Sequence, residues 1–113
     1  MSKFDDCMEQ FKNCMTNTIK VSFDEELLTK VAKGLGPSIY NADASLVSGS
    51  DQSELDRVKT NFLIKKLGLD DSPALDEAIK EVITQFGSSN RSKYRAVFYY
   101  LLAVKFDKQS VYA

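Results

Sequence analysis

Hydrophobic residues recur at helical spacing in the first part of the chain. The apolar positions fall every three or four residues, at Phe4, Met8, Phe11, Met15 and Ile19. This spacing places them on one face of an amphipathic helix. The pattern therefore predicts a helix over residues 3–19.

A second helix is predicted over residues 23–34. Ser22 with Glu25 three residues later has the form of a capping box, in which side chains and backbone N–H groups bond reciprocally at a helix start. Gly34 supplies a stop, because glycine tolerates the left-handed conformation that often ends a helix.

A third helix is predicted over residues 51–67. Asp51 and Glu54 form another start signal of the same spacing, and the apolar residues that follow them share one helical face. Gly68 followed by Leu69 has the form of a left-handed C-terminal cap with its apolar contact.

The fourth helix, over residues 73–86, has signals at both ends. Ser72 offers an N-cap, and Pro73 suits the first helical position, where its missing N–H costs nothing. The apolar residues between them and Gly87 match the helical template at every step, and Gly87 ends the run.

The fifth helix is predicted over residues 91–106, after a serine-rich connection. Its apolar residues cover most of its circumference, which is typical of a helix in the middle of a bundle. The stretch AVFYYLLAVKF is rich in strand-forming residues, but it does not alternate and has no partner strand, so a helix is favoured.

Together these patterns predict an all-α fold, a compact bundle of about five helices with the C-terminal helix central. The connections 68–72 and 87–90 are short, so the third, fourth and fifth helices should be neighbours. A chain of 113 residues, 43% of them apolar and with no repeat or linker, suits one domain. Residues 1–113 are therefore expected to form a single helical domain.

Residues 36–50 form a long connection between the second and third predicted helices, the 36–50 loop. Connections above about 12–15 residues without structure of their own are uncommon in compact domains and are often functional. Pro37 can start a helical turn that runs through Tyr40, and nearby apolar residues can anchor the rest, which predicts an ordered Ω-like loop. Tyr40, Asn41 and Asp43 are its candidate partner contacts, with a purely structural loop as the alternative.

The same loop has a weak resemblance to a calcium-binding pattern. Asn41, Asp43 and Ser45 alternate as the first oxygen ligands of such a loop do. The sixth position is Leu46 instead of glycine, and the twelfth is Gln52 instead of glutamate. No metal site is therefore predicted there.

The C-terminal segment is more basic than the rest of a chain whose net charge is −1. From residue 91 onward, five basic residues stand against one acidic residue, Asp107. Arg91, Lys93 and Arg95 are therefore candidates for an anion-binding companion to the 36–50 loop, if they lie near it.

The last two helices also have the lengths of a helix-turn-helix pair over residues 73–106. In that arrangement Arg91, Lys93 and Arg95 stand in the first turns of the second helix, where such residues contact phosphates and base edges. The near-neutral net charge and the apolar last helix count against this function. A helical hairpin whose basic end forms salt bridges explains the same residues.

The composition excludes most catalytic chemistry. The chain has no histidine, which removes Ser-His, Cys-His and His-metal sites, and it has no glycine-rich phosphate loop. We expect no enzyme activity, no cofactor and no metal. Cys7 and Cys14 lie about 10 Å apart on a helix, too far for a disulfide, and are expected to act as small buried hydrophobes.

Nothing in the sequence predicts association with a membrane. No apolar run reaches the roughly 18–20 residues that a transmembrane helix needs, and the N-terminus is too polar for a signal-peptide core. We therefore expect a cytoplasmic location, in which both cysteines stay reduced.

Three stretches resemble hallmark segments of a known family, GPSIYNADASLVSGSD at 36–51, LDRVKTNFLIKKLGL at 55–69 and SNRSKYRAVFYYLLAVKF at 89–106. They are similar to domain-of-unknown-function family 2853, whose members are small, mainly bacterial proteins. The resemblance covers residues 36–112 and leaves out the N-terminal helix. It implies a small, single-domain soluble protein with no assigned activity, cofactor or catalytic residue, and it transfers no site residue.

The sequence thus predicts a non-enzymatic protein-interaction or regulatory module that uses the 36–50 loop. An unknown protein is the expected partner, and weak nucleic-acid binding through residues 73–106 is the alternative. The oligomeric state stays open, because Tyr99, Tyr100 and Val104 lie outside the main apolar faces and suit either a second subunit or the core.

Overall fold

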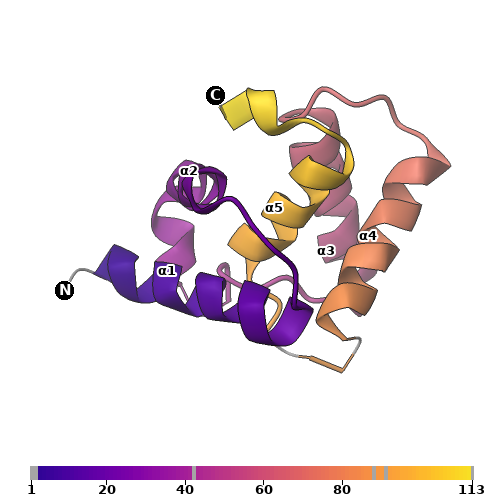
Figure 1. Cartoon of the computed structure of the whole chain (residues 1–113). Coiled ribbons are helices and arrows are strands. Elements are labelled where there is room, and N and C mark those ends of the chain that lie inside the picture. The colour runs from indigo at the N-terminus through magenta and orange to yellow at the C-terminus, as the bar shows by residue number, and fades with distance from the viewer. Residues whose placement is uncertain (1–2, 42, 88, 91, 113) are drawn as a thin grey trace.

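The computed structural model of the chain describes residues 3–41, 43–87, 89–90 and 92–112. This part of the chain contains five α-helices in the order α1 (Lys3–Asn13), α2 (Glu25–Leu35), α3 (Gln52–Arg57), α4 (Pro73–Phe86) and α5 (Arg95–Lys105). Wider π-helical turns continue α1 and α3 over Cys14–Ile19 and Val58–Ile64, and 3₁₀ turns cover Gly36–Tyr40 and Gln109–Tyr112. The predicted all-α fold is confirmed (Figure 1).

α5 lies in the middle of the bundle, with the other helices arranged around it (Figure 1). Its buried residues are Ala96, Val97, Phe98, Tyr100, Leu101, Leu102 and Ala103. α2 and α4 both pack against it, and the rings of Phe98 and Phe86 stack with 5.9 Å between their centroids. The C-terminal helix is therefore central, as its sequence predicted.

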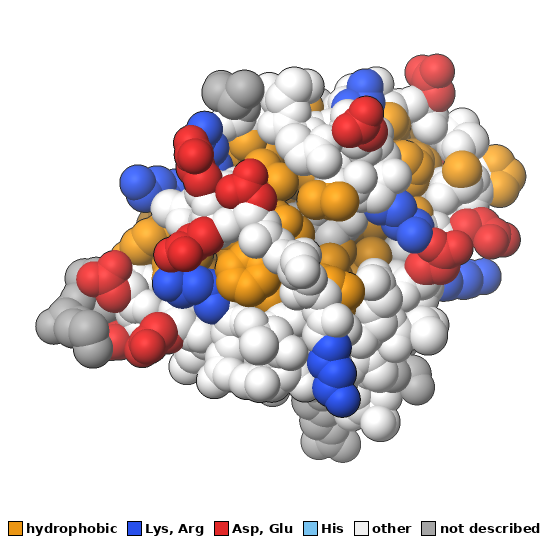
Figure 2. All heavy atoms as spheres, in the orientation of Figure 1, with side chains coloured by type: hydrophobic (Ala, Val, Ile, Leu, Met, Phe, Trp, Pro, Cys, Tyr) orange, Lys and Arg blue, Asp and Glu red, His pale blue; other side chains and the backbone are white. Residues whose placement is uncertain are grey.

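Of Tyr99, Tyr100 and Val104, for which the sequence allowed either a core or an interface position, the two tyrosines pack in or against the core. Tyr100 is buried, and Tyr99 is partly buried and stacks on Phe62 with 4.0 Å between ring centroids. Val104 is 41% exposed. Figure 2 shows hydrophobic side chains in the middle of the face seen in Figure 1, with acidic and basic side chains toward its edges.

α5 begins at Arg95, later than the predicted start at residue 91. Tyr94 is extended (φ −58°, ψ 129°) and forms an isolated antiparallel β-bridge with Leu46. The backbone N–H of Val47 donates to the carbonyl of Lys93 at 2.8 Å, and that of Arg95 donates to Ser45 at 2.7 Å. Because this stretch bonds to the 36–50 loop, it cannot continue the helix toward the N-terminus.

The start of α2 also differs from the prediction. The capping box of Ser22 and Glu25 does not form, and Asp24 caps the helix instead. The Asp24 carboxylate accepts hydrogen bonds from the backbone N–H groups of Glu26 at 3.0 Å and Leu27 at 3.3 Å. An N-cap stands directly before the first helical residue, and Asp24 has the required extended backbone there.

Glycines with positive φ follow three helical segments. Gly68 (φ +73°) and Gly87 (φ +94°) lie at the predicted stops, which are confirmed. Gly34 was the wrong stop, because α2 continues to Leu35 and ends at Gly36 (φ +63°). Glycine adopts a positive φ at less cost than residues that carry a Cβ.

The bounds of the first and fourth helices agree with the prediction. The first helical segment runs from residue 3 to residue 19 through the π-helical turns, and Lys20 ends it at φ +62°. α4 begins at Pro73, but the Ser72 hydroxyl accepts no capping hydrogen bond. The fixed φ of proline therefore defines this start, and the expected serine cap is wrong.

No helix in the described ranges is both long enough and apolar enough to cross a membrane.

Candidate functional site

A polar hollow of about 1070 Å³ lies between the 36–50 loop, the start of α3 and the connection that precedes α5. Four of the predicted site residues, Asn41, Asp43, Lys93 and Arg95, line it. Segments that are about fifty residues apart in the sequence thus meet at one place, and the basic residues do lie next to the loop.

The other two predicted residues are placed differently. Tyr40 does not line the hollow, but it ends the 3₁₀ turn that opens the loop, and it is 47% exposed. Arg91 lies outside the described residues.

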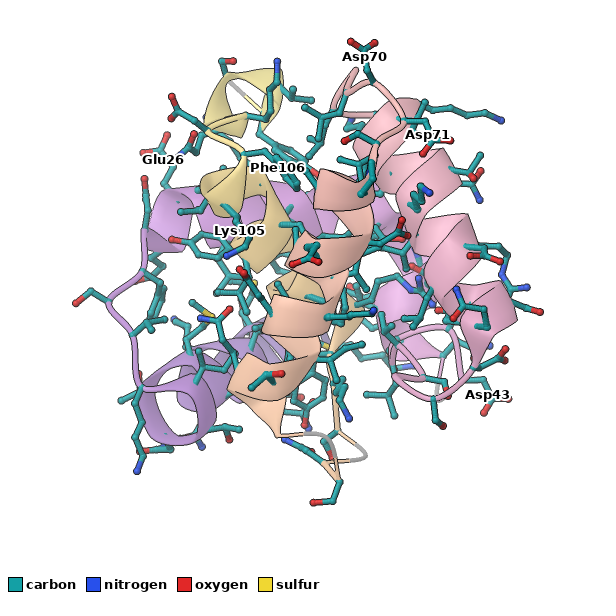
Figure 3. All side chains as sticks on the ribbon, turned by 90° about the vertical axis from the view of Figure 1, so that its right-hand side faces the viewer. Glu26, Asp43, Asp70, Asp71, Lys105 and Phe106 are labelled. Atoms are coloured by element: carbon teal, nitrogen blue, oxygen red, sulfur yellow. The ribbon has the colours of Figure 1, made fainter. Side chains whose placement is uncertain are left out.

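Asn41 shapes the exposed part of the loop. Its Oδ1 accepts hydrogen bonds from the backbone N–H groups of Asp43 at 2.8 Å and Ala44 at 2.9 Å. This is the Asx turn that asparagine often forms in loops. Asp43 is exposed, and its side chain lies beside the start of α3 at the edge of the molecule (Figure 3).

Arg95 holds the loop from the inside. Its Nε donates to the carbonyl of Ala44 at 2.7 Å, and its Nη2 donates to that of Leu46 at 3.2 Å. Nη2 also pairs with the carboxylate of Glu54, and Nη1 donates to the Tyr99 hydroxyl at 3.1 Å. One guanidinium therefore joins the 36–50 loop, α3 and α5.

Glu54 is the acidic centre of this arrangement and is only 8% exposed. Its Oε2 lies 2.9 Å from Nη2 of Arg57, while Oε1 faces Arg95. The predicted cap by Asp51 is confirmed, because its Oδ1 accepts hydrogen bonds from the backbone N–H groups of Ser53 at 3.0 Å and Glu54 at 3.4 Å. The predicted capping role of Glu54 is wrong. The Glu54 carboxylate points to the two arginines instead of closing a capping box.

Glu54 and Arg57 were not recognised as part of the site from the sequence. Their spacing is that of an ordinary helical ion pair. Only the approach of Arg95, which is 41 residues away from Glu54, gives the pair its place at the hollow. No pattern of neighbouring residues in the sequence predicts such a contact.

Lys93 is buried, with 3% of its surface exposed. Its Nζ donates to the carbonyl of Asn90, and its side chain packs against Gly49, where an added Cβ would lie 3.2 Å from the Lys93 Cε. The two described basic candidates, Lys93 and Arg95, are thus both engaged with the protein itself.

The electrostatics of the hollow are balanced. Burial lowers the pKa of Arg95, but the hydrogen bonds and charges of Tyr99 and Glu54 outweigh this effect, so the pKa lies above its ordinary value. Basic and acidic lining residues are equal in number, namely Arg57, Lys93 and Arg95 against Asp43, Asp51 and Glu54. Such a site has no strong field of either sign.

The helices at 73–106 differ from a helix-turn-helix pair at their connection. Residues 87–94 separate α4 from α5, whereas the turn in that motif has about three to four residues. Lys93 precedes the helix and does not stand in its first turn, and Arg95 opens the helix with its side chain held by Glu54.

The cysteines lie away from the hollow, in the first helical segment. Both are free thiols, Cys14 buried and Cys7 half-buried with its Sγ 3.7 Å from the carbonyl of Ile39. Burial raises the pKa of both thiols, and the charge of Asp6 adds to the rise at Cys7. In the described ranges, no three His, Cys, Asp or Glu side chains are grouped so that they could hold a metal ion.

Comparison with protein families places the chain in a known family. The family described as protein of unknown function (DUF2853) matches residues 10–110. The chain belongs to this family. The match begins well before residue 36, so the DUF2853 region includes much of the first helical segment with Cys14, which corrects the narrower resemblance seen in the sequence. No curated protein matches the chain.

Proposed function

We propose that this DUF2853 protein is a non-enzymatic interaction module that receives a protein partner at the hollow beside the 36–50 loop. The observation that carries the proposal is the way the loop is held. Arg95 binds its backbone from inside and Asn41 fixes its turn, while Asp43 stays exposed at the hollow. A loop that is ordered before binding loses little conformational entropy when a partner docks.

Tyr40 adds an aromatic contact at the start of the same loop. Nearly half of its surface is exposed, which is unusual for a large side chain in a chain whose other four tyrosines are buried or partly buried. Tyrosine is enriched among the residues that dominate binding energy in protein interfaces. Tyr40 and Asp43 together give the proposed surface an apolar ring and a charge.

Binding is favoured over catalysis by the state of the lining groups. Ser48, Ser50 and Ser89 bring hydroxyls to the hollow, but the chain has no histidine to take a proton from them. The Glu54 carboxylate is paired with two arginines, and Asp51 caps α3.

We further propose a cytoplasmic location, where the two free thiols would stay reduced.

The test is affinity capture of partner proteins with the full chain as bait. The variant with Tyr40→Ala and Asp43→Ala together should reduce the captured amount by about tenfold, which corresponds to about 1.4 kcal/mol of binding free energy. The control is Lys30→Gln, because Lys30 is exposed on α2 and absent from the hollow. Equal capture by the loop variant and the wild type would contradict the proposal.

Weak nucleic-acid binding through residues 73–106 is the alternative. Its support is the basic segment that precedes and opens α5, and the engagement of Lys93 and Arg95 within the protein weakens it. Affinity for mixed DNA at two salt concentrations decides the matter, since phosphate contacts must weaken as salt rises. Binding that falls steeply with salt would favour this alternative.

A further inference from the structure

We infer that the partner segment received by the hollow carries a carboxylate side chain, and that Arg57 binds this carboxylate. The inference rests on the proposed function and names the chemistry of the partner. It begins from Arg57, whose side chain is 60% exposed and lines the hollow. Within the described part of the chain, its guanidinium bonds only through Nη2, to Glu54.

The Glu54 carboxylate holds Arg57 in a defined position. A guanidinium has five donors in a rigid planar fork, which suits two-point binding of a carboxylate. With Nη2 bound to Glu54 at 2.9 Å, the other donors of Arg57 remain for a ligand. The side chain is therefore anchored on one edge and available on the other.

Although the lining of the hollow as a whole is balanced in charge, the cluster of Glu54, Arg57 and Arg95 within it is not. One buried carboxylate, that of Glu54, is shared by two guanidinium groups, which leaves one positive charge in excess. Arg95 is the inner partner, with 17% of its side chain exposed, and Arg57 is the outer one. The excess charge is therefore accessible at Arg57, on the hollow.

The surrounding acidic residues select a single negative charge. Asp43 and Asp51 line the same hollow and are both exposed, so they repel a phosphate dianion or a nucleic-acid backbone more strongly than a carboxylate. Within the described residues Asp43 forms no ion pair, so its oxygens can accept N–H groups of a bound peptide. This pattern fits a polar peptide segment with one acidic side chain.

The size of the hollow agrees with a peptide. Its volume of about 1070 Å³ lies just above the range for small-molecule pockets, about 300–1000 Å³. A small free carboxylate would fill only part of it. The lining includes hydroxyl and amide groups, such as those of Ser48, Ser50 and Asn41, that can bond to peptide groups.

The experiment is a titration of the full chain, followed by the amide signals of labelled protein in two-dimensional NMR. The probes are three capped pentapeptides of glycine and serine whose central residue is glutamate, glutamine or phosphoserine. We expect the glutamate peptide to shift signals around Arg57 and to bind about fivefold more tightly than the glutamine peptide. The phosphoserine peptide should bind no more tightly than the glutamate peptide.

The variant Arg57→Gln should lose this preference, and Arg57→Lys should retain part of it, because lysine keeps the charge without the fork. Lys30→Gln is the matched control and should bind as the wild type does. Equal binding of the glutamate and glutamine peptides, no shift with the glutamate peptide, or a preference that survives in Arg57→Gln would each overturn the inference.

The two proposals fail in different ways. If the Tyr40 and Asp43 variant loses partner capture while Arg57→Gln captures normally, the proposed interaction surface is supported, and the inference that Arg57 binds a carboxylate of the partner is wrong. If both variants capture normally, both proposals are wrong.

Discussion

Replacing Arg95 with methionine should destabilise the protein and release the 36–50 loop. Methionine keeps the apolar stem of the side chain and removes every hydrogen bond of the guanidinium. The carbonyls of Ala44 and Leu46 and the Oε1 atom of Glu54 then lose their shared partner. The perturbation is therefore confined to the hydrogen bonds and ion pair of the guanidinium and to its cation–π contact with Tyr99, whose ring centroid lies 5.7 Å away.

The magnitude follows from burial. Breaking a buried ion pair by removing one partner costs about 3–5 kcal/mol. The side chains of Arg95 and Glu54 are 17% and 10% exposed, which places the pair near that case. Glu54 keeps Arg57 at 2.9 Å, so its charge does not stay uncompensated. We therefore expect the free energy of unfolding to fall by about 3 kcal/mol, the lower end of the range.

Urea unfolding measures this loss. With a slope of about 1–3 kcal/mol per molar urea, the midpoint should fall by roughly 1–3 M. Hydrogen exchange should also show faster exchange of the Val47 N–H, which bonds to Lys93 across the bridge that Arg95 supports.

Two comparisons make the result decisive. Lys30→Met breaks an exposed pair with Glu26 and should cost less than about 0.5 kcal/mol. In a double-mutant cycle, Arg95→Met and Glu54→Gln should show a coupling of about 1–3 kcal/mol. A loss below about 1 kcal/mol for Arg95→Met, or no coupling to Glu54, would refute the view that this arginine holds the loop.

Three further outcomes are expected. Asp24→Ala should lower the stability by about 1 kcal/mol, seen as a lower melting temperature, because α2 loses its cap. Burial and the charge of Tyr99 raise the pKa of Tyr112 to about 12. As pH rises, the unfolded chain therefore loses the Tyr112 proton before the folded chain does, so the stability that this group contributes is lost between its ordinary pKa and 12. The urea midpoint of Tyr112→Phe should vary less with pH over that range than the midpoint of the wild type. A thiol reagent should modify half-buried Cys7 before buried Cys14, which mass spectrometry of single-cysteine variants can follow; equal rates would contradict the burial.

Several features of the fold could be predicted because they depend on neighbouring residues only. The apolar period of residues 73–86 indicates α4, and Pro73 and Gly87 give its two ends. Asp24 was overlooked because serine and aspartate both make good caps, and the choice between them depends on where the backbone is extended.

The candidate site was predictable in its parts but not in its connections. The sequence indicates the 36–50 loop and the basic residues separately. It does not show that the two lie close together, which the hypothesis of a joint site had to assume. The roles of Glu54 and Arg57 had no local signal, since a glutamate three residues before an arginine is common on helix surfaces. The partners of Lys93 and Arg95 became evident only with the chain folded.

By itself, the order of apolar and polar residues determined which segments are helical, which faces they bury and that the last helix is central. These properties follow from contacts within a few residues and from the period of 3.6. The tertiary structure alone decided that α5 starts at Arg95 and that this arginine neutralises Glu54 across 41 residues. Such contacts depend on how the helices pack, and the packing brings together charges whose separation along the chain carries no signal.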